Sequence, residues 1–300
     1  FNFQTSEVLH REALHDTIAY IRVDSNEVLC LHLFDEKRRF REITTIWDDG
    51  DHRHDTFPSK DDVYFTASHE VELITYSGPN WSSILTGVHY DKHQVDDNSF
   101  GNSNYSEYST FFEYIEAVDT SINTASIVNW TPINTHILST VIDFSPQTSM
   151  TDIEVFEQAQ SILLNADPLD ADILFIHFDE LDAAGHSYGF SIDTPEYVET
   201  LNILDGYVES IFNTLEAKRL SGEDWLFLVV SDHGGDGTSH GDASNTYINK
   251  TVFFAQHPSI DFKHQHYSNQ TDLAPTILDF LGISSPIFNC KTDGISILKQ

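Results

Sequence analysis

Cysteine and basic residues are the scarcest features of this 300-residue sequence. The two cysteines, Cys30 and Cys290, indicate neither a framework of disulfides nor a cysteine-ligated zinc site. Lys and Arg number 15 against 48 Asp and Glu, which gives a formal net charge of −33. Because so acidic a chain repels phosphate backbones and anionic lipid headgroups, nucleic-acid duplexes and membrane surfaces are disfavoured as partners.

Long hydrophobic runs are also missing. No apolar stretch approaches the roughly 20 residues that a membrane-spanning helix needs, so we expect no membrane span. No signal peptide is visible, and the first residue is Phe1 rather than Met. We therefore expect a processed form or a fragment.

Apolar runs of strand length alternate with helix-like stretches along the chain, and hydrophobic residues, at 40%, suffice for a sizeable core. Helices are predicted at 110–118, 152–166, 195–220 and 271–283. Strands are predicted at 28–34, 124–130, 172–178, 224–230 and 250–256, and a strand or an extended segment at 71–76. This alternation is typical of an α/β fold with a mostly parallel central sheet and helices on both faces.

Functional sites in such sheets form beyond the carboxyl ends of the strands. Acid, imidazole or hydroxyl side chains follow four of the predicted strands: Asp35; Ser77; Asp182 and His186; and Asp232, His233 and His240. Four glycines lie within residues 234–241, and glycine permits the backbone turns that would bring His240 back toward Asp182.

These side chains make two sets of metal ligands. One set is Asp182, His186 and His240, and the other is Asp35, Asp232 and His233. Catalytic zinc is held by three nitrogen or oxygen ligands with one open position. Two such ions about 4 Å apart can hold the attacking and leaving oxygens of a phosphoryl transfer.

Ser77 and Asn80 complete the predicted site. Ser77 stands at the start of a predicted helix, where the helix N-terminus and two metals would favour its alkoxide as a nucleophile. Asn80 offers an amide donor to a phosphate oxygen. Each candidate also has an ordinary structural alternative, because Ser77 and Asp182 could cap helices and Asp35 could be a solvated strand-terminal carboxylate.

Several segments around these residues resemble the type I phosphodiesterase/nucleotide pyrophosphatase branch of the alkaline phosphatase superfamily. The similarity covers roughly residues 70–284, in the family's order. The segments are SGPNWSSILTG (77–87), YDKHQVDDNSF (90–100), DELDAAGHSYG (179–189), SDHGG (231–235), SHGD (239–242) and TDLAPTILDFLGI (271–283).

The resemblance implies one alkaline phosphatase-like α/β domain over residues 1–300 and an extracellular or periplasmic location. It implies that Asp182, His186 and His240 hold one Zn²⁺ ion. It assigns Asp232 and His233 to a second Zn²⁺ ion, Ser77 to the nucleophile and Asn80 to the phosphate. Sulfatases of the superfamily have Arg where this chain has Trp81, which argues against a formylglycine nucleophile.

Residues 1–68 depart from the family and are expected to be divergent or truncated. The family's first metal Asp is followed by Gly, whereas Glu36 follows Asp35. We predict a two-zinc phosphodiesterase that hydrolyses a small-molecule phosphate ester through a phosphoseryl intermediate. The alternatives are hydrolysis of phosphomonoesters, phosphonates or pyrophosphates at the same site, or a metal-binding pseudoenzyme or fragment that lacks the first metal aspartate.

Overall fold

The computed structural model of the chain describes residues 63–139, 141–165, 169–263, 267–283 and 291–299, and three strands nearer the N-terminus. These strands, β1 (Ile18–Val23), β2 (Leu29–Phe34) and β3 (Phe40–Glu42), pair antiparallel in the order β1-β2-β3. The strand predicted at 28–34 is thereby confirmed. Asp35, the predicted metal ligand, lies outside the described residues.

Two further sheets form the centre of the molecule. Strands β5 (Thr124–Val128) and β6 (Ile173–His177) pair in parallel. Strands β4 (Val63–Glu70), β8 (Lys250–Gln256) and β7 (Phe227–Val230) pair antiparallel in the order β4-β8-β7. The strands predicted near 124–130, 172–178, 224–230 and 250–256 are confirmed, whereas the described pairing is parallel in one sheet only.

The segment 71–76, predicted as a strand or an extended segment, is a loop that enters Ser77, and the strand β4 ends at Glu70. The Asn80 side chain explains the loop. Its amide oxygen accepts the N–H of Glu72 at 2.8 Å, and its amide nitrogen donates to the carbonyls of Ile74 and Tyr76 at 3.1 and 2.9 Å. One side chain therefore satisfies backbone groups that a neighbouring strand would otherwise pair.

The helices begin where local signals predict. Glu113 accepts the backbone N–H of Thr110 before α3 (Phe111–Val118), Glu154 accepts that of Thr151 before α4 (Asp152–Leu163), and Pro195 begins α6 (Pro195–Leu220). The remaining helical segments are α1 (Ser77–Thr86), α2 (Tyr90–His93), η2 (Ile133–Ile137), α5 (Glu180–Tyr188), η3 (Gln270–Asp272) and α7 (Leu273–Phe280).

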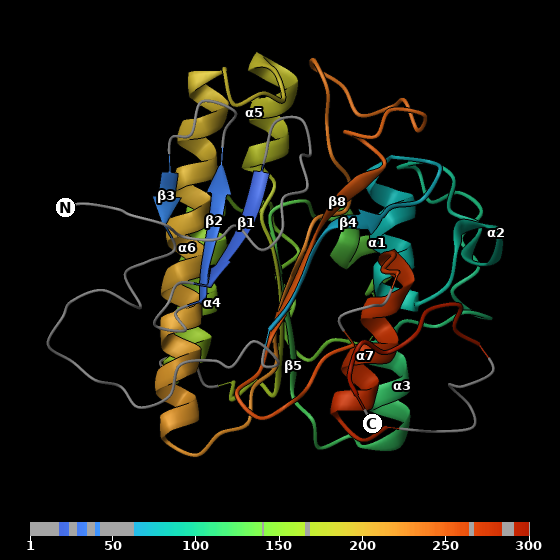
Figure 1. Ribbon diagram of the computed structural model, residues 1–300. Coiled ribbons are helices and arrows are strands. Elements are labelled where there is room, and N and C mark those ends of the chain that lie inside the picture. Colours follow the sequence, from blue (N-terminus) through green and yellow to red (C-terminus); the bar gives the residue numbers. More distant parts are fainter. Residues whose placement is uncertain are drawn as a thin grey trace, which may run out of the picture.

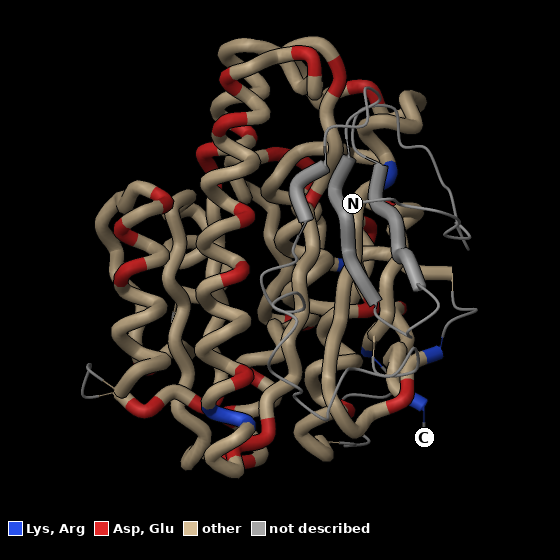
Figure 2. The backbone as a smooth tube through the Cα atoms, turned by 60° about the vertical axis from the view of Figure 1, so that its left-hand side comes forward, with Lys and Arg blue, Asp and Glu red and all other residues tan. Residues whose placement is uncertain are grey.

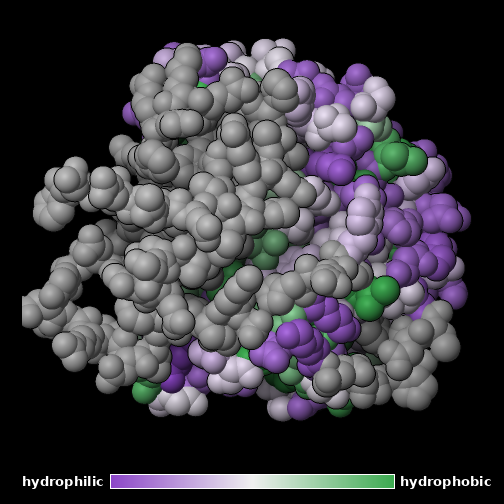
Figure 3. Space-filling model, viewed as in Figure 1, coloured by the Kyte–Doolittle hydropathy of each residue, from purple (hydrophilic) through white to green (hydrophobic). Residues whose placement is uncertain are grey.

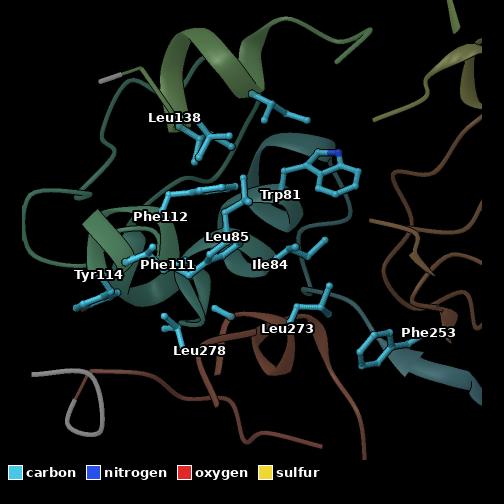
Figure 4. Packing of buried hydrophobic residues seen from close by; sticks show 14 of the residues in the cluster. Trp81, Ile84, Leu85, Phe111, Phe112, Tyr114, Leu138, Phe253, Leu273 and Leu278 are labelled. Atoms are coloured by element: carbon cyan, nitrogen blue, oxygen red, sulfur yellow. The ribbon is translucent and has the colours of Figure 1, made fainter. Parts of the chain in front are cut away.

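The helices form two layers with the strands between them. Figure 1 shows α4, α5 and α6 on one side of the sheet and α1, α3 and α7 on the other. The largest apolar cluster lies under the second layer, where Trp81, Leu85, Phe112 and Leu278 pack together (Figure 4). Residues 78–86 of α1 are all buried, so the helix that begins at Ser77 is a core helix with little freedom to move.

Acidic residues dominate the outside of the molecule. Figure 2 shows Asp and Glu along most helices and few Lys or Arg, and Figure 3 shows hydrophilic residues over much of the visible described surface. Within the described residues, no helix combines the length and the apolar character needed to cross a bilayer.

Candidate active site

The predicted site residues come from three separate parts of the chain that meet beyond the ends of β6 and β7. Asp182 and His186 lie one turn apart on α5, which starts three residues after β6 ends. Asp232 and His233 follow β7 within three residues, and His240 lies on the glycine-containing loop beyond them. Ser77 is the first residue of α1.

Asp182, His186 and His240 converge on one point. Each presents a ligand atom, and these atoms all lie within 4.8 Å of one another. The Nε2 atoms of His240 and His186 are 3.1 Å apart, and His186 Nε2 is 3.4 Å from Asp182 Oδ2. The structure therefore brings together all three members of the first predicted ligand set.

The hydrogen bond that each Nδ1 atom makes determines whether the Nε2 atom of the same ring is a donor or an acceptor. His240 Nδ1 lies 2.7 Å from the carbonyl oxygen of Thr75, and His186 Nδ1 lies 2.9 Å from that of Thr238. A carbonyl oxygen only accepts, so each Nδ1 carries the proton and each Nε2 of a neutral ring presents a lone pair.

When both rings are neutral, the first ligand set is a group of hydrogen-bond acceptors that face one another. Such atoms repel one another unless a cation lies among them. The second carboxylate oxygen of Asp182, Oδ1, is buried and has no partner among the described residues. This donor set of one carboxylate and two imidazoles fits a metal ion of the zinc type.

Asp232, His233 and Ser77 form a second group beside the first. His233 Nε2 is 3.3 Å from Ser77 Oγ and 3.5 Å from Asp232 Oδ2, while its Nδ1 donates to the carbonyl of Gly234 at 3.0 Å. The His233 ring stacks on His240, with centroids 3.8 Å apart and an interplanar angle of 15°. The two groups are therefore in direct contact through their imidazoles.

Burial sets the charge of this second group. It raises the pKa of Asp232 to about 6, although the hydroxyl of Ser77 works against the rise, and it lowers the pKa of His233 and of His240. At neutral pH the rings are uncharged and free to bind a metal, while the part of the chain that the structure describes places no buried Lys or Arg beside the ionised carboxylate. Both effects favour a cation at this position.

Asn80 has a different setting from the one predicted. Its side chain is fully buried, and its amide makes the three loop hydrogen bonds described above. It thereby fixes the backbone immediately before Ser77. The prediction that Asn80 contacts phosphate stays a prediction.

Asn98 is a residue that the sequence did not single out, although its segment carried the family resemblance. Its amide oxygen accepts the N–H of Gly78 at 2.7 Å, directly beside the nucleophile position. A Cβ at Gly78 would lie 2.7 Å from the carbonyl oxygen of Asp97, so glycine is required for this approach. No local sequence signal links residues 78 and 98, since the contact depends on the fold.

Asp179 and Gln270 were also missed. Burial raises the pKa of Asp179 to about 7, and the carboxylates of Asp182 and Asp232 add to the rise. Gln270 donates to the Asp232 carbonyl at 2.8 Å, and its amide oxygen contacts His69 Nε2 at 3.0 Å. Asp179 could have been found because it follows an apolar strand, as Asp232 does, whereas Gln270 reaches the site from a distant helix.

Comparisons with known proteins agree with this geometry. The family model described as type I phosphodiesterase/nucleotide pyrophosphatase matches residues 60–276. The chain is 32% identical over 124 residues to the catalytic subunit of GPI ethanolamine phosphate transferase 2 from Homo sapiens, a match that covers 39% of this chain and 12% of that protein.

Solved structures show a related fold. Murine ectonucleotide pyrophosphatase/phosphodiesterase 5, in an inactive form in complex with AMP, has a TM-score of 0.58 at 12% identity, covering 80% of this chain and 92% of that one. A 2-O GAG sulfatase has a TM-score of 0.55 at 14% identity, covering 79% and 66%. These neighbours have alkaline phosphatase-like folds, which agrees with the family match.

Proposed function

Because the chain belongs to the type I phosphodiesterase/nucleotide pyrophosphatase family, we propose that it is a metal-dependent phosphodiesterase with Ser77 as its nucleophile. One observation carries the proposal. The Ser77 hydroxyl lies 3.3 Å from His233 Nε2, beside a cluster of imidazole and carboxylate side chains whose ligand atoms lie close together. A hydroxyl beside such a cluster is where a metal-activated nucleophile belongs.

Two zinc ions are the metals that this donor set favours. Asp182, His186 and His240 would hold one of them. Asp232 and His233 would hold the other, and we assign the remaining carboxylate to Asp35, which ends an apolar strand as Asp232 does. When bound, zinc would supply positive charge that favours the serine alkoxide and neutralises phosphate oxygens.

The chain's own groups then account for the reaction. Ser77 Oγ attacks phosphorus, the bond from phosphorus to the leaving alcohol breaks, and a phosphoseryl ester forms. Water then cleaves that ester and restores the Ser77 hydroxyl. The positive N-terminal end of α1 favours the developing negative charge, and Asn98 fixes the Gly78 backbone beside it.

The fold supports this positioning. We infer that the two central sheets are parts of one mostly parallel sheet, as the alkaline phosphatase-like neighbours suggest, so that all ligands stand at the same edge. Phosphomonoesters, phosphonates and pyrophosphates remain alternative substrates of the same site.

A second candidate function is transfer to an alcohol instead of hydrolysis. The similarity to the human GPI ethanolamine phosphate transferase 2 subunit, 32% identity over 124 residues, favours it. In that case an acceptor hydroxyl replaces water in the second half of the reaction. A rise in release of the first product when an alcohol is added would identify the transferase.

The experiment is hydrolysis of bis(4-nitrophenyl) phosphate by the full chain, stripped with chelator and reloaded with zinc. We expect zinc to restore turnover and Ser77→Ala to lower it by about 10³-fold or more while zinc content stays unchanged. The matched control is Ser99→Ala, an exposed serine whose hydroxyl bonds only Asp97 among the described residues. Zinc binding without turnover of this diester, of a phosphomonoester, of a phosphonate or of a pyrophosphate would favour the pseudoenzyme, and an active Ser77→Ala variant would exclude Ser77 as nucleophile.

A further inference from the structure

Asp152 is a buried residue at the start of α4 whose carboxylate makes its hydrogen bonds outside that helix. Its Oδ1 atom accepts the backbone N–H of Asp179 at 2.9 Å, and its Oδ2 atom accepts that of Glu180 at 3.0 Å. Asp179 is the residue before α5, and Glu180 is the first residue of that helix. The carboxylate that caps α5 therefore comes from another helix.

The contact between α4 and α5 is reciprocal. The Oε1 atom of Glu180 accepts the backbone N–H of Asp152 at 3.1 Å. The first N–H groups of a helix have no partner within the helix, and side-chain oxygens commonly satisfy them. Here each helix satisfies an N–H group at the start of the other, so the two helices are joined at their N-terminal ends.

Asn129 links the same carboxylate to the parallel strands. Its side-chain amide donates to Asp152 Oδ1 at 2.8 Å. Its backbone N–H donates to the carbonyl of His177, the last residue of β6, at 3.1 Å, and Asn129 itself directly follows β5. Asp152 therefore connects the carboxyl ends of both parallel strands to the start of α5.

Helix α5 depends on such contacts for its position. It has nine residues, and a helix of that length is not stable by itself in water. Asp179 occupies the N-cap position, but its side chain makes no cap hydrogen bond. Later in the helix, the Phe190 ring packs directly on Gly185, where a Cβ would lie 2.2 Å from a ring carbon. Asp152 thus holds the start of a helix whose second half is held by Phe190.

The same helix carries two of the three residues in the first ligand set. Asp182 and His186 are one turn apart on α5, so both side chains lie on one face of it. Zinc accepts carboxylate and imidazole ligands only within about 2.0–2.2 Å, so a small displacement of the helix would move both ligands out of range. Groups that orient the ligands without touching the metal commonly change metal affinity by about 10–100-fold.

We propose that Asp152 is a positioning residue, which fixes the start of α5 and thereby places Asp182 and His186 for a metal ion. The metal part of this inference rests on the proposed function, whereas the ordering of α5 does not. A carboxylate suits the position because it accepts three N–H groups, and a hydroxyl oxygen with two lone pairs could not. These bonds offset the cost of burying the charge.

The first test measures the order of α5 without metal. In the presence of chelator, hydrogen–deuterium exchange of the full chain is followed by mass spectrometry. We expect peptides from α5 to exchange about tenfold faster in Asp152→Ala than in wild type, because the bonds that hold the start of the helix are lost. Peptides from α7, in the other helical layer, should keep their rates.

The second test measures zinc affinity by competition with a chromogenic chelator. An Asp232→Asn background removes a ligand of the second position, so the first position is read alone. In that background we expect Asp152→Ala to weaken zinc binding about 10–100-fold. Asp152→Asn, which keeps the side-chain volume and one acceptor oxygen, should recover part of the affinity.

The matched control is Asp143→Ala. Asp143 accepts the backbone N–H and the hydroxyl of Thr124 at 2.8 and 3.0 Å, at the opposite end of β5. Its loss should change neither zinc affinity nor the exchange of α5 relative to the rest of the chain.

Two results would overturn the role of Asp152. One is a zinc affinity of Asp152→Ala equal to that of its background, and the other is faster exchange spread evenly over all peptides. If Asp152→Ala does not fold, Asp152→Asn gives the same two readouts. A wild-type chain that binds no zinc would instead defeat the proposed function, and the exchange of α5 would still decide whether Asp152 orders that helix.

Discussion

Replacing Asp232 by Asn should stabilise the metal-free protein. Burial raises the pKa of the Asp232 carboxyl from 3.8 to about 6, a shift of roughly two pH units. At about 1.4 kcal/mol per unit, the fold disfavours the ionised carboxylate by about 3 kcal/mol. Asn carries no charge, and a weakened hydrogen bond to Ser77 offsets about 1 kcal/mol of the gain. We therefore expect metal-free Asp232→Asn to be more stable than wild type by about 2 kcal/mol at pH 8.

The size of the effect depends on pH. Because the folded-state pKa of Asp232 is raised, the contribution of Asp232 to wild-type stability falls as the pH rises from 3.8 to about 6 and is constant above that. The advantage of Asp232→Asn should therefore almost vanish by pH 4. Zinc should reverse the order, since wild type gains about 2.7 kcal/mol at a hundredfold excess over Kd and the variant loses a ligand.

Urea unfolding in chelator at pH 4, 6 and 8 measures these differences. The matched control is Asp119→Asn, at an exposed carboxylate whose pKa is lowered by the hydroxyl of Ser121 and which should gain nothing at high pH. A metal-free Asp232→Asn protein that is less stable than wild type by the same amount at every pH would refute the reasoning, because the carboxylate would then carry no electrostatic penalty.

Three further predictions follow from the same geometry. Zinc affinity at the second position should weaken about tenfold between pH 7 and pH 5, because Asp232 must first lose its proton; calorimetry showing a flat profile would contradict this. His240→Ala should lower zinc content by about one ion per chain, whereas His257→Ala, at a buried histidine that contacts Asp224, should leave it unchanged. Gly234→Ala should cost about 2 kcal/mol or more in unfolding free energy, because its Cβ would lie 2.0 Å from a backbone carbonyl oxygen. Gly206→Ala, in open space on α6, should instead stabilise the chain by up to about 1 kcal/mol; equal effects of the two glycine substitutions would reject the packing argument.

The sequence predicted two members of the first ligand set, Asp182 and His186, because their pattern is local. Asp182 and His186 are one helical turn apart after an apolar strand, and strand ends gather at one edge of an α/β sheet. Strand β4 was missed because polar residues interrupt it, and the loop after it looked more apolar than the strand itself. Its alternating burial follows from its place at the edge of the β4-β8-β7 sheet.

Contacts between distant residues could not be predicted in the same way. Two hydrogen bonds depend on which loops the fold brings together. Asn98 accepts the N–H of Gly78, and Gln270 donates to the carbonyl of Asp232. The use of the Asn80 amide within its own loop also depends on a backbone turn that no residue pattern specified. Strand pairing likewise joins residues far apart in the chain, so periodicity identifies strands but not their neighbours.

Anomalous diffraction at the zinc edge from crystals grown with zinc tests the metal centre most directly. We expect one peak within about 2.0–2.2 Å of the ligand atoms of Asp182, His186 and His240, and a second beside Asp232 and His233 at about 4 Å from the first. Zinc peaks only at other positions would contradict the two-metal site. So would crystals grown in excess zinc that show no peak between the imidazoles of His186 and His240.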